Sequence, residues 1–217
     1  MTRTRFSALA LMIGAGTFWL AWFLMPDAGT NDPSHILEAV RASHTAVWWS
    51  VLVQLVSCVA FVPAVLGLAT VQGSQRSTAT LVGGSLVLIG AMGMCADAFF
   101  HLVAYYMTAE GVTKEAVLAP MTLLQTEGIM FLVPLMIPFL VGGMIYAAGT
   151  RKAGLVSATP AWFFWMALVM VVVGAGVVSV TGQGRQMVAL SFLGLVALGY
   201  GWIGFELLDS QASHRTT

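Results

Sequence analysis

The chain has 217 residues, of which 59% are hydrophobic and only 8% are charged, far below the roughly 25% charged residues of a soluble domain. Its nine basic and nine acidic residues cancel, so no basic surface points to a nucleic-acid partner. With a mean hydropathy of +0.89, the chain is expected to be an integral membrane protein that lies in the lipid bilayer.

Arg3 and Arg5 precede the first apolar run, which is longer than the ~7 to 15 residues of a signal peptide and is predicted to be a retained helix. Runs long enough to cross a ~30 Å hydrocarbon layer lie near 6–25, 46–70, 80–107, 117–148, 159–181 and 186–208. The sequence therefore predicts a single all-α transmembrane domain over 1–217, a bundle of six helices with a short cytoplasmic tail at 209–217.

The linker after the first helix contains its own helix-start signal. Asp32 and Pro33 stand where a helix N-cap and first helical residue are expected, so a short amphipathic helix should follow them. The basic residues of the loops favour a cytoplasmic N-terminus and C-terminus, because more of them fall on that side of the predicted topology. The expected location is a bacterial inner membrane.

Two segments of the chain resemble each other. Residues 52–63 align without gaps on 123–134, and the alignment matches Gln54 with Gln125 and Pro63 with Pro134. A true match predicts a parallel repeat of helical hairpins, in which the second and third helices correspond to the fourth and fifth. The alternative is chance similarity between two apolar helices.

Ionisable side chains inside the apolar runs are the main functional signal. In the stretch MCADAFFHLVAYY, Asp97 and His101 lie one helical turn apart on one face. Counting along the helices places Gln54, Asp97 and Glu127 at one depth near the bilayer centre, with His44 nearer the surface. Gln125 precedes Glu127 in the same helix. The pattern predicts a polar pocket that opens outward.

Each buried charge costs at least ~2.5 kcal/mol in a membrane, so it should face the bundle interior and have a function. We expect binding or relay of a proton, a cation or a small ligand. Asp97 and Glu127 would be the exchanging pair, and Asp97 would orient His101. Gln54 and Gln125 would bind a small polar solute. No catalytic residue is assigned, and a non-enzymatic role is favoured. The alternative is that these groups only hold helices together.

Histidines suggest two further alternatives. His44 and His101 could ligate a b-type haem near the outer face of a redox subunit. Together with Asp97 or Glu127 they could instead hold the zinc ion of a membrane hydrolase. Because the chain has almost no extramembrane mass, a homo-oligomer or a larger membrane complex is the expected setting.

The segment VPAVLGL at 62–68, between an acidic linker with an Ala/Leu-rich helix and a short basic loop, resembles a broad group of bacterial six-helix membrane proteins. The resemblance covers the second to fourth helices. It implies the architecture alone, because the group carries no assigned activity to transfer.

Overall fold

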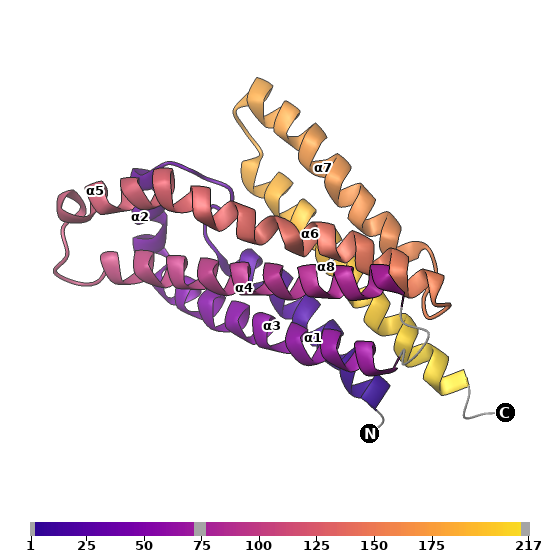
Figure 1. Ribbon diagram of the computed structural model, residues 1–217. Helices are drawn as coiled ribbons and strands as arrows, with labels where there is room; N and C mark the ends of the chain where they lie inside the picture. The colour runs from indigo at the N-terminus through magenta and orange to yellow at the C-terminus, as the bar shows by residue number, and fades with distance from the viewer. Residues whose placement is uncertain (1–2, 72–76, 214–217) are drawn as a thin grey trace.

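The computed structural model describes residues 3–71 and 77–213, and over these residues the protein is entirely helical (Figure 1). The elements in chain order are α1 (Arg3–Leu24), α2 (Pro33–Ala42), α3 (His44–Val71), α4 (Thr78–Met107), α5 (Lys114–Leu123), the π-helical turn η2 (Leu124–Gly128), α6 (Ile129–Lys152), α7 (Thr159–Thr181) and α8 (Arg185–Ser213). Six helical stretches, one of them formed by α5, η2 and α6 together, are long and apolar enough to span a membrane. The prediction of six long apolar helices is confirmed.

The long helices are packed in an order that differs from their order in the chain. Helix α8 lies between α7 and α1, α1 packs on α3, α3 on α4, and α4 on α6 (Figure 1). The two chain ends lie at one end of the bundle, here called the terminal end, whereas α2 and α5 lie at the other, the α2 end (Figure 1). Which side of a membrane each end faces stays a prediction.

Glycines let α4 and α6 approach until their backbones touch. A Cβ atom on Gly90 would lie 2.3 Å from the Phe139 amide nitrogen, and one on Gly142 would lie 2.6 Å from the Val87 amide nitrogen. Small residues at helix contacts are the usual means of close packing in membranes, where lipid provides no hydrophobic drive between helices. This contact fixes the position of α6 relative to α4, the helix that carries Asp97 and His101.

The contact between α6 and the α7–α8 pair is much looser. Helix α7 packs mainly on α8 and diverges from α6 towards the α2 end (Figure 1). Within the apolar 18-residue segment of Lys114–Lys152, only 17% of the segment is buried inside the protein, and the share is the same for Thr159–Thr181. Much of the surface of α6 and of α7 is therefore left uncovered by the rest of the bundle.

Helix α2 begins as the sequence predicts. Asp32 has an extended backbone, its Oδ1 accepts a hydrogen bond of 2.9 Å from the Ser34 amide, and Pro33 is the first helical residue. The helix buries Leu37 and Val40, and on its exposed side Glu38 pairs with Lys114 at the start of α5. Together with the linker that precedes it, α2 covers the α2 end of the bundle.

The Glu38–Lys114 pair should make this cover sensitive to acid. The hydrogen bond and charge of Lys114 lower the pKa of Glu38 below its ordinary value of 4.5. A lowered pKa means that the stabilisation is present above that value and is lost as pH falls through the lower folded-state pKa. The protection factors of the α2 amides, which correct the observed hydrogen-exchange rate for the intrinsic rate at each pH, should therefore fall on acidification below about pH 4. Glu38→Gln should have lower protection factors at neutral pH and lose the part of the acid-dependent fall that is due to this pair; equal profiles for the two proteins would contradict the prediction.

Two features differ from the sequence prediction: the end of the last helix and the regularity of the helix at 123–134. Helix α8 continues to Ser213 instead of ending near 208, so most of the predicted tail at 209–217 is helical, and 214–217 lie outside the described residues. Residues 52–63 lie within the α-helix α3, but their proposed counterpart at 123–134 contains the π-helical turn η2. The hairpin repeat stays a prediction.

Candidate functional site

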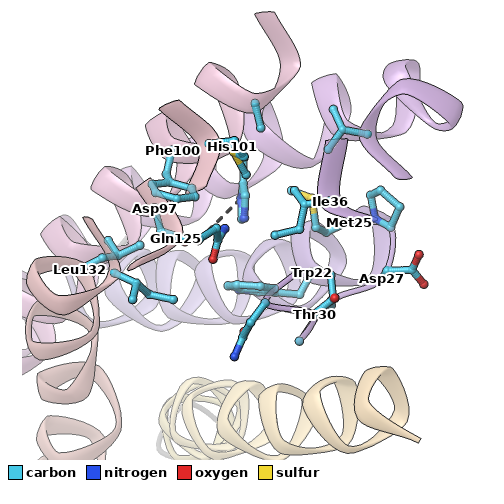
Figure 2. A pocket seen from close by; sticks show the side chains of 18 of the residues that line it. Trp22, Met25, Asp27, Thr30, Ile36, Asp97, Phe100, His101, Gln125 and Leu132 are labelled. Carbon is cyan, nitrogen blue, oxygen red and sulfur yellow. Dashed lines mark ion pairs between the residues drawn. The ribbon is translucent and has the colours of Figure 1, made fainter. Parts of the chain in front are cut away.

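A cavity of about 210 Å³ lies among α1, α4, η2 and α6 near the α2 end (Figure 2). The linker between α1 and α2 forms part of its wall through residues 25–31, and Ile36 and Val40 of α2 add to it. Its polar side chains from the long helices are Trp22, Asp97, His101 and Gln125. We call this cavity the polar pocket.

The Asp97 side chain is hydrogen-bonded by Gln54 of α3, a residue that does not line the cavity. Its side chain is 94% buried, and its Oδ2 accepts a hydrogen bond of 2.8 Å from Nε2 of Gln54. The same nitrogen of Gln54 donates to the Met94 carbonyl oxygen at 3.1 Å. Gln54 is itself fully buried and does not line the cavity. The predicted proximity of Gln54 and Asp97 is therefore found, with Gln54 as the group that positions the carboxyl.

His101 lies one turn after Asp97, on the same face of α4, as expected. Its Nδ1 is 3.7 Å from the Asp97 Oδ2, which suits an ion pair but is too long for a hydrogen bond. This nitrogen is buried and has no hydrogen-bond partner among the described residues. Buried polar nitrogens in proteins nearly always have a hydrogen-bond partner. His101 therefore keeps the capacity to form one more hydrogen bond beside the pocket.

Two more residues with polar side chains line the same cavity. The indole Nε1 of Trp22 is buried without an acceptor among the described residues, and the Trp22 ring meets that of His101 edge-on with centroids 5.6 Å apart. The Gln125 amide extends from η2 into the pocket between His101 and Trp22 (Figure 2). Tryptophan only donates, whereas an amide both donates and accepts, so the pocket offers mixed hydrogen-bonding groups.

Glu127 is not part of this arrangement. It is exposed on the outer surface of η2 and does not line the polar pocket. A π-helical turn has a wider hydrogen-bonding step than an α-helix, and one residue of α-helix is about 100° of rotation. The sequence count gave Glu127 the same depth as Asp97 but not the same side of its helix. Residues two apart on a helix point in nearly opposite directions, so Gln125 lines the pocket and Glu127 does not.

His44 and His101 line different cavities. The His44 ring stacks on Tyr105 with centroids 3.7 Å apart, and its Nε2 is 3.1 Å from the Tyr105 carbonyl oxygen. His44 lines a shallow hollow with Arg41 and residues 108–112, apart from the polar pocket. The structure thus does not place the two histidines as opposing ligands of one haem. Among the described residues, no group of three or more His, Cys, Asp and Glu side chains is placed to hold a metal ion.

Sequence reasoning missed Trp22 and the linker. A tryptophan near the end of an apolar run is typical of a membrane-interface belt, and nothing in the sequence signals that its nitrogen is buried with no acceptor among the residues that the structure describes. The linker residue Asp27, which has a positive φ of 49°, also lines the pocket and pairs with His35 at 3.0 Å. The path of the linker over the cavity depends on contacts with residues far away in the sequence, which no local sequence pattern encodes.

The described residues of the pocket offer hydrogen-bond donors and acceptors, and among them no arrangement identifies a reaction. Comparison with known proteins adds no function, because no family model, no curated protein and no solved structure matches the chain at a significant level. The likeness seen around residues 62–68 transfers no activity. Any function assigned to the chain therefore rests on the pocket alone.

Proposed function

We propose that this multi-pass helical protein binds a small ligand in the polar pocket, with Asp97 and His101 as the anchoring pair. The observation that carries the proposal is the gathering of polar side chains around one cavity: among the described residues the buried nitrogens of His101 and Trp22 have no hydrogen-bond partner, and the Gln125 amide lies between the side chains of His101 and Trp22 (Figure 2). Leaving such groups unpaired costs about 1–3 kcal/mol each. A ligand that pairs them would recover that cost.

The support of Asp97 by Gln54 favours binding over mere helix attachment. Gln54 fixes one carboxyl oxygen from the rear, and the carboxyl faces the cavity together with His101. If the groups served only to join helices, they would be expected to satisfy one another. Instead, the His101 Nδ1 lies 3.7 Å from the Asp97 Oδ2 and has no hydrogen-bond partner in the described part of the chain. A ligand hydroxyl, carbonyl or proton would complete the set.

The test is to identify what the pocket retains during purification. The full-length protein is purified in mild detergent, its small molecules are extracted with organic solvent, and they are quantified by mass spectrometry for wild type and variants. We expect a compound near one per protein in wild type, and at least about tenfold less in Gln125→Leu and His101→Phe, because tenfold corresponds to the loss of one good hydrogen bond. Asp97→Asn should also lower it.

Glu127→Gln is the matched control, because Glu127 lies in the same turn as Gln125 but outside the pocket. It should retain the compound at the wild-type level. If all the variants retained the compound, or if none of the proteins carried one, the ligand-binding proposal would be wrong. Loss of folded protein in Asp97→Asn and His101→Phe alike would support a purely structural role.

A further inference from the structure

A second cavity adjoins the polar pocket on the side of the terminal end. It has a volume of about 260 Å³ and lies between α6 and α8, over Phe18 of α1 and Met94 of α4. Val133 and Met136 of α6 line both cavities. The second cavity, here called the apolar groove, follows α6 from Val133 to Leu140, a length of about 10 Å. The two cavities are thus neighbours along α6.

The apolar groove opens to the side of the bundle. On its α6 wall, Val133 is 45% exposed and Ile137 is 54% exposed, and α6 makes few contacts with α8. Its other wall consists of Phe192, Leu193 and Val196 of α8. Every side chain lining it is apolar. In a membrane this groove would face hydrocarbon, so an apolar chain could enter from the lipid.

The charges around the two cavities restrict the head group. Neither cavity is lined by a Lys or Arg side chain among the described residues, so a phosphate or carboxylate would be desolvated without a counter-charge. Two carboxyls, those of Asp97 and Asp27, line the polar pocket, and Asp27 is already paired with His35. An ammonium could pair with Asp97 or with the Gln125 amide oxygen, but it has no lone pair to accept from the Trp22 N–H. A hydroxyl or carbonyl oxygen can accept from Trp22 or Gln125, and a hydroxyl can also donate to His101.

We infer that the polar pocket and the apolar groove form one site for a single-chain lipid with an uncharged, oxygen-bearing head. The head bonds to Gln125 and His101 beside Asp97, and the chain lies between α6 and α8 in contact with Ile137 and Phe192. This inference rests on the proposed function, since it names the class of ligand for the same pocket. It adds the lateral route and the tail site.

The experiment uses hexadecanol carrying a photoreactive diazirine midway along its chain. Full-length protein in detergent micelles is irradiated with this probe, and labelled peptides are located by mass spectrometry. We expect labelling in the segments of α6 and α8 that line the apolar groove. Unlabelled hexadecanol should compete at least tenfold more strongly than hexadecanoate or hexadecylamine, which have the same tail but charged heads.

Two tryptophan variants test the tail site. Ile137→Trp fills the groove from a half-exposed position, so folding should tolerate it, and we expect labelling to fall about tenfold. Val141→Trp is the matched control, because Val141 is 40% exposed on the same helix but does not line the groove. It should label as wild type does. Gln125→Leu, which alters only the head site, should lower labelling to a similar extent.

The outcomes separate the two proposals. If Gln125→Leu lowers labelling but Ile137→Trp has no effect, a head site exists without this tail groove, and only the present inference is overturned. If Ile137→Trp lowers labelling but Gln125→Leu and Asp97→Asn do not, the groove holds ordinary lipid and the present inference is overturned, whereas the proposed function is decided by the compound that the variants retain during purification. Equal competition by all three heads would likewise overturn the uncharged head.

Discussion

Gly90→Val should destabilise the protein by about 3 kcal/mol or more, the upper range for forcing extra atoms into a packed contact. The added Cβ would lie 2.3 Å from the Phe139 amide nitrogen and 2.5 Å from the Phe139 Cα. These are backbone atoms of α6, so no side chain can rotate away and the two helices must separate. Thermal unfolding of the purified protein, followed by its tryptophan fluorescence, measures the loss.

Gly176→Val provides the control for the intrinsic effect of valine in a helix. Gly176 is exposed on α7, and a Cβ there would meet nothing within 4 Å. Since valine favours a helix more than glycine does, this variant should be as stable as wild type or slightly more stable. Equal stability of the Gly90 and Gly176 variants would show that α4 and α6 are not in backbone contact.

Gln54→Leu should cost about 2 kcal/mol, because it leaves the buried Asp97 carboxyl without its side-chain donor. The substitution also leaves the Met94 carbonyl oxygen without the hydrogen bond from Gln54. The loss should be visible as a lower unfolding midpoint in a denaturant series. The same variant should weaken ligand retention, since Asp97 would no longer be fixed beside His101.

The double variant Gln54→Leu/Asp97→Leu tests whether loss of the Gln54–Asp97 hydrogen bond is the cause of the destabilisation in Gln54→Leu. Removing both partners of a buried hydrogen bond costs much less than stranding one of them. We therefore expect the double variant to unfold at a higher denaturant concentration than Gln54→Leu alone. Strict additivity, with a coupling energy below about 0.5 kcal/mol, would mean that Gln54 and Asp97 do not interact in the folded protein.

The parts of the fold that depend on local rules could be predicted from the sequence. Helix spans can be derived from length and hydropathy, and the α2 start from the Asp32–Pro33 pair, whose capping bonds the structure contains. That Asp97 and His101 lie on the same face of α4 likewise follows from their spacing of four residues along the helix. The close approach of α4 and α6 was not predicted, because it depends on glycines far apart in the chain lying opposite each other.

The site was predictable only in part. Asp97 and His101 lie on α4, an uninterrupted α-helix, and periodicity placed both correctly on one face. Glu127 and Gln125 are two residues apart in η2, so they point in nearly opposite directions, and a count of depth alone did not show which of them lines the pocket. The Trp22 nitrogen, which has no hydrogen-bond partner among the described residues, had no signal in the sequence, since an absent hydrogen bond depends on every neighbour around it.

The packing order of the helices has a consequence for biosynthesis. Among the described helices, α8 is translated after α1, on which it packs, whereas α7 packs mainly on α8. The helices α1, α3, α4 and α6 can associate before α8 is made, so the side of α1 that contacts α8 stays without this partner until then. The α7–α8 hairpin therefore docks after the other long helices, and the groove beside α6 acquires its second wall only then.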